Sequence, residues 1–112
     1  AKNFGERIYY QDFSKFPAIV RDVAFVVSRD IEVDYMLDIV SSLKEYFLEN
    51  VVIFDIYEGK GIPYNTKSVG LRFFYRAFDR TLTDAEANNV HEKIVRNIVA
   101  LTKAKIRGED NQ

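Results

Sequence analysis

The sequence predicts an α+β domain of the ferredoxin-like type, with elements in the order βαββαβ. In this arrangement a four-stranded antiparallel sheet carries two helices on one face and leaves the other face open. Two observations predict it. Residues 51–78 form two runs rich in β-branched and aromatic residues, separated by turn formers. Residues 33–47 and 87–101 instead repeat apolar residues at spacings of three and four, as amphipathic helices do.

Composition fits one domain in a reducing compartment. The chain has 112 residues, of which 47% are hydrophobic and 29% charged, and its net charge is −1. It contains no cysteine, so no disulfide framework or thiolate metal site is expected. No signal-peptide pattern and no apolar run of membrane-spanning length is found, which favours a cytoplasmic protein without a membrane partner. The chain does not start with Met, so we expect a fragment of something longer.

The first half of the chain predicts a lead-in, a strand and a helix. Residues 1–15 are too apolar for a free tail and are interpreted as an extended segment packed on the body. The domain proper is expected over residues 16–108. Its first strand, Arg21 to Ser28, is apolar from Val23 to Val27 and is therefore a candidate central strand. A helix is expected from Asp34 to Leu48.

The hairpin that follows has two different faces. Strands are expected at Asn50 to Glu58 and Lys67 to Phe78, joined by a loop rich in Gly, Pro and Asn. Alternation directs one set of side chains towards a core: Val52, Phe54, Ile56, Val69, Leu71, Phe73 and Tyr75. The other set mixes polar, charged and aromatic groups: Ile53, Asp55, Tyr57, Ser68, Gly70, Arg72, Phe74 and Arg76. This second face suits unpaired bases, although a solvated face with an Asp55–Arg72 or Asp55–Arg76 pair is the simpler alternative.

The last part of the chain predicts a helix and a short strand. Thr83 and Glu86 have the spacing of a capping box, which predicts a helix from Asp84 to about Lys103. Ala104 to Arg107 can form a final strand with Ile106 facing inward, and residues 109–112 are expected to be a polar tail.

Charge is unevenly distributed along the chain. Residues 31–58 contain one Lys and seven acidic groups, whereas residues 59–83 contain five basic groups and one acid. The basic groups are Lys60, Lys67, Arg72, Arg76 and Arg80. Such segregation can produce a local positive patch on a nearly neutral protein, or a hairpin that pairs with an acidic helix.

Signs of catalytic chemistry are weak. His91 is the one histidine, and without Cys or a second His nearby it is a poor metal ligand. We expect it on the surface, bonded to a nearby loop. The run Gly59-Lys60-Gly61 leads into a strand rather than a helix N-terminus, so it does not form a phosphate cradle. Residues 28–34 contain no glycine, which argues against the phosphate loop of an acylphosphatase.

Four motifs occur in the order seen in one known family. They are SKFPA with Arg21-Asp22, FDIYEG at 54–59, KSV at 67–69 and DRTLTDAE at 79–86. Over roughly residues 9–107 the chain resembles the ferredoxin-fold anticodon-binding domain that closes the β subunit of bacterial phenylalanyl-tRNA synthetase. The resemblance implies a non-catalytic domain that holds the anticodon stem-loop of phenylalanine tRNA.

The resemblance also implies a site and partners. Anticodon contacts transfer to Asp55, Tyr57 and Ser68, with Tyr57 stacking on a base and the other two bonding to base edges. From this sequence itself we add Lys67, Arg72, Phe74 and Arg76 as RNA-binding candidates. The implied protein partners are the rest of the β subunit and an α subunit in a heterotetramer. ATP and Mg²⁺ would belong to the complete ligase, and no cofactor is expected in this domain.

Two other functions compete with RNA binding. The open face could instead dock against protein, as an assembly module of the same fold. A regulatory domain that binds a small molecule is a third hypothesis. Such domains usually need a glycine-bearing loop after the first strand, and this chain has none there.

Overall fold

The computed structural model describes residues 16–111, and the side chains of residues 16–108. Its elements are β1 (Ile19–Ser28), α1 (Val33–Leu43), β2 (Leu48–Tyr57), β3 (Thr66–Tyr75), α2 (Asp84–Thr102) and β4 (Lys105–Asn111). This order confirms the predicted βαββαβ arrangement. No helix in the described part of the chain is long and apolar enough to cross a membrane.

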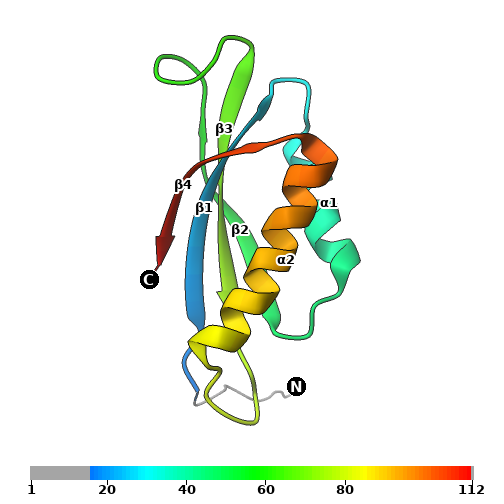
Figure 1. Cartoon of the computed structure of the whole chain (residues 1–112), viewed down its shortest axis with the longest axis vertical. Coiled ribbons are helices and arrows are strands. Elements are labelled where there is room, and N and C mark those ends of the chain that lie inside the picture. The colour runs from blue at the N-terminus through cyan, green and yellow to red at the C-terminus, as the bar shows by residue number, and fades with distance from the viewer. Residues whose placement is uncertain (1–15, 112) are drawn as a thin grey trace, which may run out of the picture.

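The four strands form one antiparallel sheet in the order β2-β3-β1-β4. The apolar strand β1 is therefore central, as its sequence predicts. Helices α1 and α2 lie side by side on one face of this sheet, and the β2–β3 loop projects beyond its end (Figure 1). The opposite face has no helix over it, and the term open face is used for it below.

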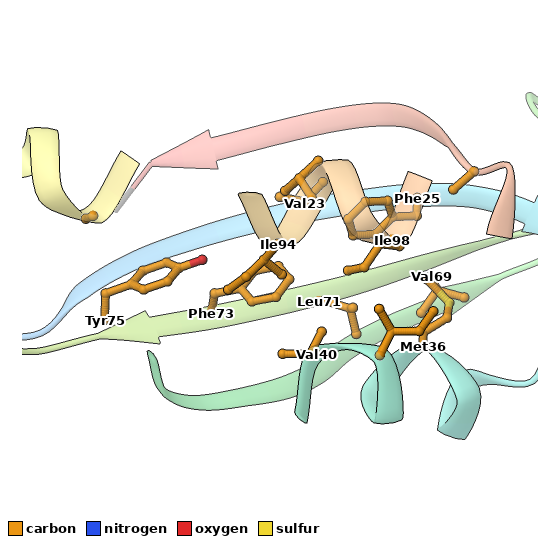
Figure 2. Packing of buried hydrophobic residues seen from close by; sticks show 14 of the residues in the cluster. Val23, Phe25, Met36, Val40, Val69, Leu71, Phe73, Tyr75, Ile94 and Ile98 are labelled. Atoms are coloured by element: carbon orange, nitrogen blue, oxygen red, sulfur yellow. The ribbon is translucent and has the colours of Figure 1, made fainter. Parts of the chain in front are cut away.

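The core fills the space between the sheet and the helices. The inward residues of β3 alternate as predicted, and Val69, Leu71, Phe73 and Tyr75 are each 0% exposed. They meet Ile94 and Ile98 from α2 and Met36 and Val40 from α1 (Figure 2). Because the inward half of β3 is fully occupied by this core, the outward half is the part of the strand that can meet a partner.

Three elements differ in length from the predictions. Helix α1 ends at Leu43 rather than Leu48, because Lys44 adopts the left-handed conformation at φ 51° and its N–H bonds to the carbonyl of Ser41. Strand β3 ends at Tyr75, short of Phe78. Strand β4 is longer than predicted and includes residues 109–111, which the sequence assigns to a tail. The predicted lead-in at residues 1–15 lies outside the described residues.

The prediction for His91 is wrong. Its side chain is buried rather than on the surface, and a hydrogen bond of 2.7 Å joins its Nδ1 to the Tyr75 hydroxyl. The direction of donation follows the His91 tautomer. The edge of the imidazole also meets the Phe73 ring, at 5.3 Å between centroids. Burial raises the pKa of the Tyr75 hydroxyl far above its usual range, so Tyr75 stays neutral at any pH at which the domain is folded.

Replacing Tyr75 by Phe should lower the free energy of unfolding by about 1–3 kcal/mol, because a buried nitrogen of His91 loses this partner. Urea denaturation followed by circular dichroism would measure the loss. Tyr35→Phe is the matched control, since Tyr35 is 43% exposed on α1 and should change stability by less than about 0.5 kcal/mol. Equal stability of the two variants would contradict a stabilising Tyr75–His91 bond.

The predicted capping box is confirmed at the start of α2. The Thr83 hydroxyl accepts from the Glu86 N–H, and the Glu86 carboxylate accepts from the Thr83 N–H, each at 3.1 Å. The Thr83 backbone bond is the main cause that holds the pKa of Glu86 below its ordinary value of 4.5. A lowered folded-state pKa adds stability above that ordinary value, and the added stability is lost as the pH falls through the folded-state pKa.

Glu86→Gln should therefore flatten the pH dependence of stability. We expect the melting temperature of the parent chain to exceed that of the variant by most near neutral pH, and the difference to shrink as the pH falls from about 5 to about 3. Thermal melts across that range would measure it. A difference that grows on acidification would show that the sign of the Glu86 shift is opposite.

Candidate nucleic-acid interface

The open face is formed by the outward residues of β3 and the residues paired with them. Ser68, Gly70, Arg72 and Phe74 alternate with the buried residues of β3. The pairing register places a β2 residue opposite each of them, and residues directly opposite each other share a face. These pairs are Tyr57–Ser68, Asp55–Gly70, Val52–Arg72 and Asn50–Phe74.

A β-bulge in β2 changes which side chains reach this face. Ile53 pairs with Leu71 and Asp55 pairs with Gly70, so Phe54 is an extra residue between two consecutive partners. Strict alternation placed Phe54 on the core side and Ile53 on the open face, and both assignments are wrong. Val52 also lies on the open face, whereas Asp55, Tyr57 and Ile56 point as predicted. The bulge therefore places Phe54, Asp55 and Tyr57 together.

Gly70 makes room for Phe54. A Cβ added to Gly70 would lie 2.6 Å from Cζ of the Phe54 ring, a distance that real Cβ atoms do not adopt. The sequence suggested that Gly70 admits a base or a backbone segment, but the group that approaches it here is the Phe54 ring. The guanidinium carbon of Arg72 lies 5.2 Å from the centroid of that ring.

Tyr57 is held in place by the loop that follows it. Its hydroxyl donates a 2.6 Å hydrogen bond to the carbonyl of Lys60. Gly59 has φ +136°, and a Cβ there would lie 3.1 Å from the Tyr57 hydroxyl, so glycine suits both the backbone and the contact. The FDIYEG motif thus provides an aromatic ring and the turn that fixes it.

Arg107 covers this ring, a contact that the sequence did not predict. Its guanidinium carbon lies 5.3 Å from the centroid of Tyr57. Arg107 comes from β4, and both β1 and β3 lie between that strand and β2. The approach depends on the whole width of the sheet, so no local pattern around residue 107 could indicate it.

Asp55 and Ser68 differ sharply in access. Asp55 is exposed, and within the described part of the chain its carboxylate has no ion pair and no hydrogen bond. Ser68 is 1% exposed, and its hydroxyl has no hydrogen-bond partner among residues 16–108. A buried hydroxyl without a partner is unfavourable, so a ligand that reached it would gain a satisfied hydrogen bond.

The two arginines of β3 and its end form ion pairs, but not with Asp55. Arg72 donates from Nε and Nη2 to the two oxygens of Asp22, both at 2.8 Å, across the β1–β3 register. Arg76 donates from Nε to Glu49 at 3.1 Å and from Nη1 to the carbonyl of Phe16. The alternative of an Asp55–Arg72 or Asp55–Arg76 pair is therefore wrong.

The remaining candidates are spread over the sheet. Lys67 pairs with Val27, whose side chain is buried under the helices, so Lys67 lies on the helix-covered face. Phe74 lies half-buried on the open face. Arg76 follows Ser68 by eight residues, roughly 26 Å along an extended strand. Asp55, Tyr57 and Ser68 form one group, and Lys67 and Arg76 lie away from it.

Ion pairs remove much of the predicted positive patch. Arg80 bonds to Glu86, so three of the five basic groups in residues 59–83 have a carboxylate partner. The partners come from β1, β2 and α2 rather than from the acidic helix α1. Within the described residues, no three His, Asp or Glu side chains cluster as a metal site requires.

Comparison with known proteins identifies a family along almost the whole chain. The "Ferredoxin-fold anticodon binding domain" family matches residues 14–107. A phenylalanine–tRNA ligase β subunit of Syntrophus aciditrophicus (strain SB) is 49% identical over 104 residues, which are 93% of this chain and 13% of that protein. The corresponding protein of Clostridium tetani (strain Massachusetts / E88) is 41% identical over 106 residues, 95% of this chain and 13% of its own length.

The chain thus spans about an eighth of the length of the curated relatives that it matches. Among solved structures, the de novo designed protein Foldit4 superposes with a TM-score of 0.57 at 15% identity. The match covers 85% of this chain and 96% of the designed one, and it supports the fold alone.

Proposed function

The chain belongs to the ferredoxin-fold anticodon binding domain family, and from that premise we propose that its open face binds unpaired bases of the anticodon loop of phenylalanine tRNA. The observation that carries this proposal is the grouping of Tyr57, Asp55 and Ser68 at one end of the face. The group combines an immobilised aromatic ring, a carboxylate without a partner and a buried hydroxyl without one. Single-stranded RNA is recognised by stacking and by hydrogen bonds to base edges, and these residues supply both.

Each residue has a distinct role in this proposal. Tyr57 stacks on one base, and Arg107 leaves the ring to cover the outer side of that base. An ionised carboxylate can only accept hydrogen bonds, so Asp55 selects a base edge with N–H donors, such as that of guanine. Ser68 can donate or accept, and it becomes satisfied when the base replaces Arg107 above it.

The larger assembly is inferred from the relatives. Their β subunits are about eight times longer than this chain, so we infer that it acts as one domain of a cytoplasmic phenylalanine–tRNA ligase that also contains an α subunit. ATP and Mg²⁺ would serve that complete ligase. The contribution of this domain is to hold the tRNA, without making or breaking a bond.

Tyr57→Ala should weaken binding of the anticodon stem-loop roughly 5- to 150-fold, because stacking of one base is worth about 1–3 kcal/mol. The measurement is an NMR titration of the 112-residue chain with that RNA. Tyr46→Ala is the matched control, since Tyr46 is 77% exposed on the loop before β2. Loss of thermal stability parallel to the loss of binding would assign Tyr57 a structural role instead.

The ion pairs of the arginines set an expectation for salt dependence. If Arg72 and Arg76 keep their carboxylate partners, Lys60, Lys67 and Arg107 remain to neutralise phosphates from this part of the chain. Three phosphate contacts give a slope of about −2 for log K against log salt, whereas five would give about −3.5. Titrations at four or more salt concentrations distinguish the two. The steeper slope would mean that RNA breaks the Asp22–Arg72 and Glu49–Arg76 pairs.

A protein-docking function is favoured by one observation. Strand β2 lies at the edge of the sheet, and its residues Ile53 and Ile56 are 40% and 52% exposed on the helix-covered side. Exposed apolar residues on an unpaired edge suit contact with another protein domain. Absence of NMR shifts at millimolar RNA would favour this function over anticodon binding.

A further inference from the structure

We propose that Phe54 is a second stacking platform, which holds the nucleobase adjacent to the one on Tyr57. The inference rests on the proposed function and extends it to a residue that was expected in the core. Its ligand is an unpaired base of the same RNA strand, recognised through its aromatic face. Stacking accepts any base, so Phe54 would add affinity whereas Asp55 and Ser68 add selectivity.

The first observation is that Phe54 is exposed where a folded domain has reason to bury it. Its side chain is 45% exposed in the middle of the open face. The bulge that brings it there leaves an extra residue unpaired in β2. Bulges often re-aim a side chain next to a functional site, and here the residue re-aimed is an aromatic one beside Asp55.

The second observation is that the ring has a built seat. The absence of a side chain at Gly70 lets the ring lie directly on β3. Arg72 lies against the ring and is itself fixed by two 2.8 Å bonds to Asp22, whose side chain is 8% exposed. A ring held by backbone and by a fixed guanidinium loses little freedom when a base stacks on it, and this favours binding.

The third observation is spacing. Tyr57 pairs with Ser68 and Phe54 lies over Gly70, two residues further along β3 and therefore about 7 Å away. Sheet surfaces that bind single-stranded RNA use aromatic residues on adjacent strands to stack two or three successive bases. The free carboxylate of Asp55 lies beside both rings, so two bases splayed over this region would have one hydrogen-bond acceptor between them.

The test uses the 112-residue chain and anticodon stem-loops of phenylalanine tRNA that carry 2-aminopurine at one anticodon position at a time. Stacking on an aromatic ring quenches this fluorescent base. Phe54→Ala should weaken binding roughly 5- to 150-fold and abolish quenching at one position, and Tyr57→Ala should abolish it at a neighbouring position. Ile56→Ala is the matched control, because Ile56 is 52% exposed on the same strand but on the other face.

Two further variants separate stacking from folding. Phe54→Leu keeps an apolar side chain over Gly70 without an aromatic plane, so it should keep the melting temperature and lose the quenching. Gly70→Ala keeps the ring but pushes it off its seat, and it should weaken binding in the same direction. These variants keep the proposal testable even if Phe54→Ala unfolds.

The outcomes are distinct. Unchanged binding by Phe54→Leu and Gly70→Ala, with Tyr57→Ala impaired, would overturn the role of Phe54 and leave the proposed function intact. Loss of quenching at the same position in the Phe54 and Tyr57 variants would show one stacking site rather than two, and would also overturn it. Failure of the parent chain to bind any of the RNAs would overturn the proposed function and this inference together.

Discussion

One extra residue in β2 determines what the open face presents. Because Phe54 is bulged between Ile53 and Asp55, the side chains that follow return to the register in which Asp55 and Tyr57 face outward. Val52, before the bulge, faces outward as well. Without the bulge, a strand that placed Val52 outward would turn Asp55 and Tyr57 towards the helices. The core on one side and the candidate interface on the other are therefore compatible only through this irregularity.

The charge of the face follows from the same compact packing. Arg72 lies in the middle of the sheet, where an unpaired guanidinium would be costly to desolvate, and its bidentate bond with Asp22 compensates for that cost. Removing one partner of such a pair leaves the other charge uncompensated, so the two residues form one structural unit. This accounts for Asp22 in the Arg21-Asp22 motif without any role in binding. Arg21 faces the other way and bonds to Asn88 of α2.

Local patterns were sufficient to predict the fold, and long-range contacts limited what could be predicted of the site. The alternation of β3 and the Thr83–Glu86 capping box are properties of adjacent residues, and both are confirmed. His91 was misplaced although a signal existed, since it continues the buried spacing of Ala87, Ile94 and Ile98. The bulge has no Gly or Pro to mark it. The carboxylate partners of the arginines and the approach of Arg107 depend on strands that meet only in the folded sheet.

The free domain holds its candidate base site partly closed, and the magnitudes indicate what this does to binding. A base that stacks on Tyr57 must displace a cation–π contact worth about 0.5–2 kcal/mol. It also gives the buried Ser68 hydroxyl a partner, which relieves a penalty of about 1–3 kcal/mol. The two terms nearly cancel for a base that bonds to Ser68. A base with the wrong edge pays for the displacement without that relief, so Arg107 would weaken binding of every base but penalise the wrong ones most.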